Sequence, residues 1–488
     1  MSALINRLSE RNVIIIGILF SLLNVGFVVT ENFWGLLLPL GLALVAAIVL
    51  ALDKVLLFLV FSTPLSIFYF NPNLHVGFTL PTEPILFGIM ILFFVKLLYE
   101  GRFAPEVVWH PISVVILINL FWILFTSFSS TLPFVSFKFF VARVWFITVF
   151  FYLMSQLMRR RRNLKLFFWL YMIPLAAVVI YTMYVHSQHG FTKETSTWVM
   201  FPFFKEHTSY GAVLAMYIPV AFVFTFVAQH GLNNRIMAFI IFAILLVGVI
   251  FSFTRAAWVS LAVALVAMVL IIFKVRKEIL ALMVVAGLAV LWYHRSDLLE
   301  RFEKNEQVSS DNLTEHVESI SNISTDASNL ERVNRWKSAF RMFEERPWLG
   351  HGPGTYMFLY APYQKPHEKT IISTNAGDMG NAHSEYIGPL AESGFIGMLS
   401  VFAIVAVTMI YGIRVYYRLE DRELKYIALA AILGLITYWT HGFLNNFLEM
   451  DKAACPVWGF SALLVVLDRY GDELSAQRLG GRTGGTSN

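Results

Sequence analysis

Long apolar runs recur along almost the whole chain, and they constrain its fold more than any other feature. Runs of about 17–23 residues can cross roughly 30 Å of hydrocarbon as helices. Only 14% of the 488 residues are charged, whereas a soluble domain is about a quarter charged. The sequence therefore predicts an all-α polytopic membrane protein with about 12–14 transmembrane helices. We count fourteen runs, which begin near Asn12, Phe33, Lys54, Leu80, Pro111, Lys138, Leu164, Thr208, Ile236, Ala257, Ile279, Phe395, Tyr426 and Cys455.

Clusters of basic residues between the runs predict how the chain is oriented. The strongest are Arg159–Arg162, Lys274–Lys277 and Arg414–Lys425, and such loops stay on the cytoplasmic side of a membrane. Counting runs from these clusters places the N-terminus inside and the polar stretch Tyr293–Ser393 outside. The same loops account for the net charge of +5, so we expect a lipid bilayer as partner and no nucleic acid.

The polar stretch divides the chain into three expected parts. Residues 1–293 form an N-terminal transmembrane bundle, residues 294–393 a large outer loop with a catalytic helix, and residues 394–488 C-terminal transmembrane helices with a cytoplasmic tail. The outer loop begins with the polar segment Arg301–Asn329, which is rich in Ser and Asn.

Two helices are expected inside the outer loop. Leu330–Glu345 has apolar residues at a helical spacing, typical of an amphipathic helix lying on a membrane. These residues are Val333, Trp336, Phe340 and Phe343. A second, short helix is expected from His383 to Ser393, because Gly394 favours a stop.

Three arginines near the predicted outer surface indicate an anionic ligand. Arg143 lies more than a turn inside an apolar run, where an arginine costs roughly 2.5–3.5 kcal/mol unless it is paired or faces water. We therefore expect a polar cavity around it. Arg255 follows Phe253-Thr254 at a hairpin tip. An arginine that only anchors the chain at the membrane interface is an equally favoured interpretation there. With Arg332, these guanidiniums match the oxygens of a lipid pyrophosphate.

His383 is the best candidate for a catalytic base. An ordinary pKa near 6.5 suits proton removal from a hydroxyl at neutral pH. The alternative is a surface or helix-capping histidine. Several neighbours are expected to orient the ring, to stabilise its protonated form or to supply a carboxylate: Asn381, Ser384, Glu385, Glu392, His441 and Glu449. Arg335 is interpreted as a supporting basic residue that touches lipid headgroups.

Metal and cofactor chemistry have no sequence support. The chain has one cysteine, Cys455, and it lacks His-Glu-x-x-His and acidic-pair motifs. It also lacks a Walker-type or GxGxxG phosphate loop. We therefore expect no metal ion and no cofactor.

A series of short motifs resembles the O-antigen ligase and polymerase superfamily of bacterial envelope glycan enzymes. The resemblance is specific from about Thr208 to Phe447, whereas the first six runs match only in being apolar. The motifs are Phe253-Thr254-Arg255-Ala256-Ala257-Trp258, Arg332 four residues before Trp336, Pro347-Trp348-Leu349-Gly350-His351-Gly352-Pro353-Gly354, Asn381-Ala382-His383-Ser384 and Glu392-Ser393-Gly394-Phe395-Ile396-Gly397.

The resemblance implies a fold and a reaction. It implies a GT-C-type membrane bundle in the bacterial inner membrane, with its active site facing the periplasm. Such enzymes move a glycan from undecaprenyl pyrophosphate to an acceptor hydroxyl, without a metal ion and with inversion of the anomeric centre. By position, Arg255 and Arg332 would bind the pyrophosphate and His383 would activate the acceptor. The role of Arg143 is inferred from its burial alone.

The shared motifs do not determine which acceptor receives the glycan. A ligase uses lipid A-core, a polymerase uses a second carrier-linked glycan, and a protein O-oligosaccharyltransferase uses Ser or Thr hydroxyls. The ligase and the polymerase are equally favoured, because the extra C-terminal domain usual in the protein enzyme is absent. A transporter or flippase of lipid-linked glycans is the alternative from another class, but it predicts repeats and broken helices that the sequence lacks.

Overall fold

The computed structural model describes residues 10–30, 35, 37–71, 76–101, 103–227, 231–275, 293, 327–370, 373 and 380–483. The chain forms two compact units, Met1–Phe58 and Leu59–Asn488. This division does not test the predicted boundaries near residues 293 and 393, which stay predictions. The predicted run near Ile279 and the polar segment up to residue 326 lie outside the described residues.

The first unit contains α2 (Glu10–Val29) and most of α3 (Leu37–Ser62). Helix α3 is kinked at Ala51, where φ is −143° and ψ is 41°. The runs predicted to begin near Phe33 and Lys54 are therefore one kinked helix, and the count of fourteen is wrong at this point. Because one helix fewer precedes Arg159, the count that placed the N-terminus inside loses its basis.

A β-hairpin follows α3, in a segment that was predicted to continue as a membrane helix. Strands β1 (Ile67–Asn71) and β2 (Val76–Leu80) pair antiparallel, with Ile67 opposite Leu80. Aromatic and β-branched side chains predominate in both strands, which suits pleated pairing. Apolar composition did not distinguish this hairpin from a helix, because both structures use the same side chains here.

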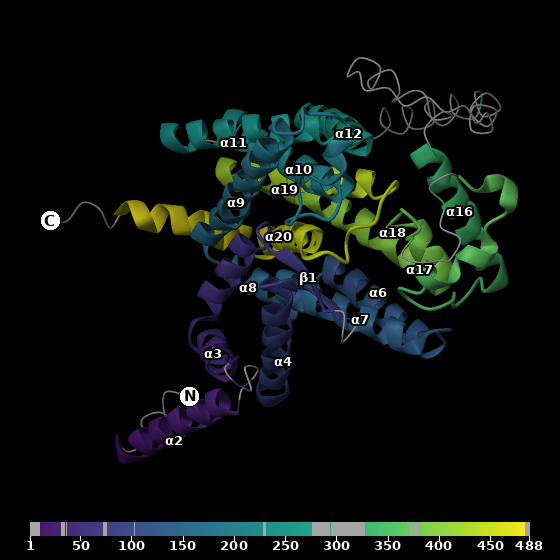
Figure 1. Cartoon of the computed structure of the whole chain (residues 1–488). Coiled ribbons are helices and arrows are strands. Elements are labelled where there is room, and N and C mark those ends of the chain that lie inside the picture. The colour runs from purple at the N-terminus through teal and green to yellow at the C-terminus, as the bar shows by residue number, and fades with distance from the viewer. Residues whose placement is uncertain are drawn as a thin grey trace. The chain divides into compact units, whose positions relative to one another are not determined.

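Helices make up the rest of the described chain (Figure 1). Three of the α-helices begin with proline, which has no N–H to leave unpaired in a first turn: α5 (Pro105–Val108), α6 (Pro111–Phe128) and α7 (Pro133–Ile147). The others are α4 (Thr82–Glu100), the π-helical η2 (Thr148–Leu153), α8 (Met154–Leu157), α9 (Arg161–Ser187), η3 (Thr195–Thr197), α10 (His207–Phe222), η4 (Val223–Val227), α11 (Leu232–Phe251), α12 (Arg255–Ile272), α16 (Ala327–Glu345), α17 (Tyr356–Leu359), η5 (Ala361–Tyr363), η6 (Pro366–Glu368), α18 (Ile387–Arg418), α19 (Arg422–His441) and α20 (Asp451–Thr483).

Eleven helical segments of the described chain are long and apolar enough to cross a membrane. They are Gly41–Ser62, Thr82–Glu100, Pro111–Phe128, Pro133–Leu157, Arg161–Ser187, His207–Val227, Leu232–Phe251, Arg255–Ile272, Ile387–Arg418, Arg422–His441 and Asp451–Gln477. A shorter apolar helix lies at Ile18–Val29. The predicted fold class is confirmed: the chain is an all-α polytopic membrane protein.

Helices α10, α19 and α20 form the core of the second unit, where they lie side by side (Figure 1). All three are buried along most of their length. Their close approach depends on Gly434 of α19, where a Cβ would lie 3.0 Å from the Met216 carbonyl oxygen and 2.6 Å from the Phe460 ring. Small residues at such positions let membrane helices pack backbone to backbone.

The two ends of α19 lie in two polar clusters. At its start, Arg161 is paired with Asp421 at 2.9 Å and with Glu423 at 2.5 Å. At its other end, the carbonyl of Gly442 accepts a hydrogen bond from the backbone N–H of Glu385, which lies two residues after His383. Twenty helical residues span about 30 Å, so the two clusters lie at opposite ends of α19. We call them the Arg161 end and the His383 end. The basic loops at Arg159–Arg162 and Arg414–Lys425 meet at the Arg161 end, as predicted.

Helix α16 lies over the His383 end, and it confirms the helix expected from Leu330 to Glu345. Its buried face carries small and polar residues as well as Met342, and it packs on a small core of tyrosines and alanines. Phe340, by contrast, is 47% exposed. The apolar stripe identified in the sequence therefore does not form the main contact of this helix with the protein. That it lies on a membrane stays a prediction.

Candidate functional site

His383 lies in the turn that leads into α18. The predicted short helix begins at Ile387 and not at His383, and Gly394 breaks α18 with a φ of 71°. His383 itself has a φ of 47°, a left-handed conformation that non-glycine residues adopt mainly where the surroundings enforce it. Asn381 enforces it in part, because its Oδ1 accepts the His383 N–H at 3.1 Å. Asn381 thus holds the backbone of His383; that it orients the ring stays a prediction.

Ser384 has a different role from the one predicted. Its hydroxyl accepts the backbone N–H groups of Tyr386 at 3.2 Å and Ile387 at 3.3 Å. These donors lie at the start of α18, so Ser384 caps the helix. It thereby fixes the direction in which the chain leaves His383.

Arg335 is the nearest charged neighbour of His383. Its Nη1 lies 3.2 Å from His383 Nε2 and donates to the Asn381 carbonyl at 3.1 Å. Its Nε donates to Glu331 Oε1 at 2.7 Å, and its guanidinium lies 5.5 Å from the centre of the Tyr360 ring. Only 8% of Arg335 is exposed. The prediction of a basic residue facing lipid headgroups is therefore wrong, although Arg335 does support the site.

Arg332 lies one turn before Arg335 on α16. Its Nε donates to the Leu444 carbonyl at 3.1 Å, which attaches α16 to the connection between α19 and α20. Arg332 is also close enough to His383 to lower the pKa of the imidazole. The structure therefore brings Arg332, Arg335 and His383 together, although they come from segments far apart in the chain.

Arg255 begins α12, and the residue before it contacts the start of α10. The hydroxyl of its neighbour Thr254 donates to the His207 carbonyl at 3.0 Å. The carboxyl group of Glu206, next to His207, has its pKa raised by burial, and Thr208 and Arg332 oppose this shift. Phe253 has a φ of 49°, so both motifs of the site contain a residue in the left-handed conformation.

The His383 imidazole is neutral at physiological pH. Burial lowers its pKa to about 3, together with the positive charges of Arg335 and Arg332. The side chain of Asn445 acts in the opposite direction and raises this pKa. It makes no hydrogen bond of ordinary distance and angle, however. A neutral imidazole has the lone pair that a base requires.

The connection between α19 and α20, residues 442–450, lines the site and is organised by Glu385. One carboxylate oxygen, Oε1, accepts the Tyr438 hydroxyl at 2.5 Å and the backbone N–H groups of Phe447 and Leu448 at 2.8 and 2.9 Å. The backbone N–H of Glu385 donates to the Gly442 carbonyl at 2.8 Å. These bonds assign Glu385 to holding this connection, a role that the sequence did not predict.

Arg143 contacts the same connection. Its Nη1 donates to the Leu448 carbonyl at 3.5 Å, and it lines a small cavity of about 40 Å³ with Glu385 and Glu392. Burial raises the pKa of Glu449, and Arg143 opposes that shift. A polar cavity around Arg143 was predicted; this one contains charged side chains, but most of its lining is apolar. Arg143 and Arg332 thus contact this connection at two different carbonyls, those of Leu448 and Leu444.

Glu392 supports the outer layer. Its Oε1 accepts the backbone N–H of Tyr356 at 3.0 Å. The carbonyls of Ala391 and Glu392 accept the N–H groups of His351 at 3.1 Å and Gly352 at 2.7 Å. Glu392 therefore contacts the turn around Gly352, and its supporting role in the reaction stays a prediction.

Three neighbours of the site were missed by the sequence analysis. Glu331 could have been identified from the sequence, because it lies four residues before Arg335 and charges at that spacing on a helix face each other. Asn445 and Glu206 had no sequence signal, because only the folded chain brings them near the arginines. Among the residues in the described ranges, no three His, Cys, Asp or Glu side chains are grouped to hold a metal ion.

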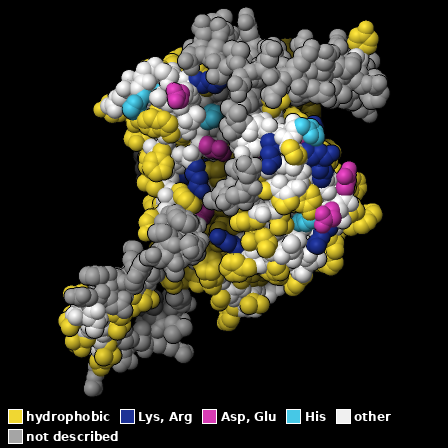
Figure 2. Space-filling view, turned by 45° about the vertical axis from the view of Figure 1, so that its right-hand side comes forward, with side chains coloured by type: hydrophobic (Ala, Val, Ile, Leu, Met, Phe, Trp, Pro, Cys, Tyr) yellow, Lys and Arg dark blue, Asp and Glu magenta, His cyan; other side chains and the backbone are white. Residues whose placement is uncertain are grey.

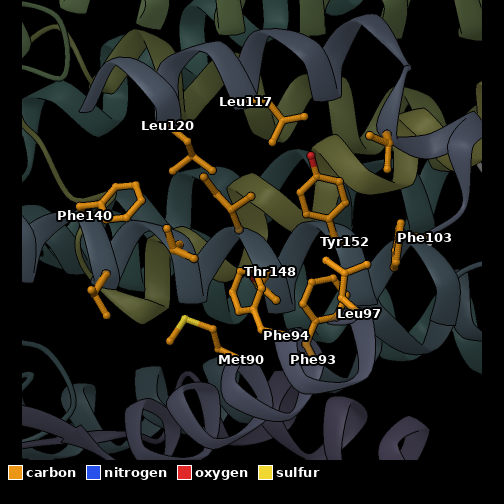
Figure 3. Close-up of a pocket in the computed structure, with 14 residues that line it drawn as sticks. Met90, Phe93, Phe94, Leu97, Phe103, Leu117, Leu120, Phe140, Thr148 and Tyr152 are labelled. Carbon is orange, nitrogen blue, oxygen red and sulfur yellow. The ribbon is translucent and has the colours of Figure 1, made fainter. Parts of the chain in front are cut away.

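On the face of the molecule that Figure 2 shows, charged side chains and histidines lie among hydrophobic side chains. A second, larger cavity of about 450 Å³ lies between α4, α6, α7 and η2. Figure 3 shows Phe93, Phe94, Leu117, Leu120 and Phe140 pointing into it. Almost all of its lining is apolar, so it offers room for hydrocarbon and no site for polar chemistry.

The fold and this site define a polytopic membrane protein with a neutral histidine beside two arginines at one end of its bundle. Residues 240–402 match a protein family described as O-Antigen ligase. This segment contains Arg255, Arg332, Arg335, His383 and Glu392, and the predicted resemblance to the O-antigen ligase and polymerase superfamily is confirmed. Comparison with curated proteins gives no match.

Proposed function

We propose that the chain is a glycosyltransferase that moves a glycan from undecaprenyl pyrophosphate to an acceptor hydroxyl. The observation that carries this proposal is the pairing of His383 Nε2 with Arg335 Nη1 at 3.2 Å, beside Arg332. A neutral base next to fixed cations is what an acid-free displacement of a diphosphate requires. The match to O-Antigen ligase over residues 240–402 supports the same reaction class.

The proposed step is a single displacement. The acceptor hydroxyl gives its proton to Nε2 of His383, and its oxygen forms a bond to the anomeric carbon of the glycan. The bond between that carbon and the diphosphate oxygen breaks, and the diphosphate leaves with the electron pair. Attack opposite the leaving group inverts the anomeric centre.

The arginines are proposed to stabilise the departing diphosphate. Arg332 and Arg255 supply planar guanidiniums that match phosphate oxygens, so the step needs no metal ion and no cofactor. Arg143 was predicted to join them, but its contacts with Leu448 and the Glu392 cavity support a positioning role. We propose that Arg143 holds the connection between α19 and α20 from inside the bundle.

The proposed setting is a bacterial inner membrane in a GT-C-type bundle, with the His383 end facing the periplasm. Its basis is the meeting of the basic loops at the Arg161 end, which the positive-inside tendency assigns to the cytoplasm. Lipid A-core and a second carrier-linked glycan are the two proposed acceptors, which correspond to a ligase and a polymerase.

A transfer assay with the purified protein in lipid tests the proposal. We expect His383→Asn to abolish transfer from undecaprenyl-pyrophosphate-linked glycan, while His367→Asn, at an exposed histidine of the same layer, retains it. Wild-type transfer by His383→Asn contradicts the assigned base, and complete loss with EDTA contradicts the metal-free step. Mass spectrometry of the product then identifies the acceptor as lipid A-core, glycan or protein.

A further inference from the structure

The Nε2 lone pair of His383 is occupied by Arg335 in this structure. Nη1 of Arg335 lies 3.2 Å from it, and a guanidinium has donors but no acceptor. Nε2 must therefore accept, and the proton of the neutral ring must be on Nδ1. The atom that would take a proton from an acceptor hydroxyl is thus covered by Arg335.

The bonds of Arg335 differ in strength on its two sides. Its Nε donates to the carboxylate of Glu331 at 2.7 Å, and Glu331 is only 3% exposed. Its Nη1 has neutral acceptors, Nε2 of His383 and the Asn381 carbonyl. Hydrogen bonds to charged acceptors are roughly twice as strong as those to neutral ones. A diphosphate can therefore draw the Nη side away from His383 while Nε stays on Glu331.

The charges around His383 favour the same exchange. Arg335 and Arg332 approach it from α16, and Asn445 approaches it from the connection between α19 and α20. Glu331 and Glu206 act on these arginines and not on the imidazole, and His441 is near Arg332. Two bound negative charges would offset the guanidiniums that now disfavour protonation of His383.

We propose that Arg335 couples donor binding to activation of His383. The donor diphosphate takes Nη1 of Arg335, which uncovers Nε2 for the acceptor hydroxyl. This inference rests on the proposed function of the site. It has the consequence that an acceptor is activated only after the donor has bound, which prevents His383 from acting on a hydroxyl when no glycan is ready for transfer.

Nitrogen-15 NMR of the histidines tests this coupling in the full-length protein in lipid nanodiscs. The signal missing from His383→Asn identifies His383, and inorganic pyrophosphate is the probe, with its binding measured separately by equilibrium dialysis. Without the probe, we expect a neutral ring protonated on Nδ1 down to about pH 5, because the pKa lies so low. With bound pyrophosphate, we expect the titration midpoint to rise by about 1–3 pH units.

Arg335→Gln provides the matched variant. In this variant, the titration midpoint of His383 should already be higher than in the wild type when pyrophosphate is absent. Pyrophosphate should then raise the midpoint by less than it does in the wild type. If this variant does not fold, the wild-type titration alone decides. Pyrophosphate that binds without moving the His383 signal overturns the coupling and leaves the proposed function standing. A protein that binds no pyrophosphate, and whose His383→Asn variant transfers glycan normally, overturns both.

Discussion

Nη1 of Arg335 lies 3.2 Å from Nε2 of His383, although 48 residues separate the two in the chain. The contact joins α16 to the turn before α18, and it brings the base of the proposed reaction against a buried cation. Its geometry depends on Glu331, Asn381 and Tyr356, which hold the guanidinium or its backbone.

Replacing His383 should remove catalysis and leave the fold intact. We expect His383→Asn to lower the transfer rate roughly 10²- to 10⁴-fold, the range usual for loss of a general base. Asparagine is accommodated well in a left-handed conformation, so the melting temperature should change little. The rate is measured with carrier-linked glycan. A variant that retains more than a tenth of the wild-type rate would contradict the role of His383.

Breaking the Glu331–Arg335 pair should destabilise the outer layer. Glu331→Gln leaves a buried guanidinium without its carboxylate, which typically costs about 3–5 kcal/mol. A drop in melting temperature and a loss of transfer are expected together. Glu100→Gln is the matched control, because its pair with Lys96 has the same i,i+4 spacing but is 52–64% exposed. Equal melting shifts for the two variants would show that burial of the Glu331 pair has no consequence.

Acid should loosen the same layer through Glu368. Arg341 donates to both carboxylate oxygens of Glu368 at 2.6 Å, and Lys337 lies 3.5 Å away. Arg341 and Lys337 hold the pKa of Glu368 below its ordinary 4.5 in spite of burial. Because the folded-state pKa is the lower one, this stabilisation is complete above pH 4.5 and is lost as the pH falls through the folded-state value.

Hydrogen exchange of α16 measures this loss. Protection in wild type should fall as the pH drops below 4.5, after correction for the intrinsic exchange rate. In Arg341→Gln the protection should be lower at neutral pH and should change less on acidification. An unchanged pH profile in Arg341→Gln would exclude this pair as the cause.

Gly394 should not accept a side chain. Its φ is +71°, and a Cβ there would lie 2.2 Å from the Trp348 carbonyl oxygen. Gly101→Ala is the matched control, because Gly101 has a φ of +70° but no atom within 4 Å of its Cβ position. Gly101→Ala should cost only the left-handed strain of about 1–2 kcal/mol. Gly394→Ala should cost more and should lower transfer, because it displaces the Pro347–Gly354 turn from α18. Equal losses of stability would contradict the steric part of this argument.

Sequence patterns predicted the membrane fold because the length of an apolar helix is a local property. They failed at Ile67–Leu80, where an apolar segment forms a hairpin, and at Ala51, where two predicted spans are one kinked helix. Gly394 was predicted to end a short helix and does break α18. His383 was identified by its residue type and motif, but its position before the helix was not.

The sequence did not predict contacts between residues that come from distant segments of the chain. Arg335 was assigned to lipid headgroups, because a basic residue on an amphipathic helix usually faces them. Glu385 was assigned to the histidine, yet it binds the connection between α19 and α20. Arg143 was predicted to lie in a polar cavity; the cavity that it lines is mostly apolar, and its carboxylate neighbours depend on how α7, α18 and the connection pack.

The sequence by itself determined that the chain is a bundle of apolar helices interrupted by one polar stretch. It did so because the composition and length of a segment, which are local properties, decide whether it can span hydrocarbon as a helix. Only the tertiary structure decided that Arg335 faces His383, and that Arg332 and Arg143 contact the same connection. Those choices depend on which side chains are brought within a few ångströms of one another, and no local pattern encodes that.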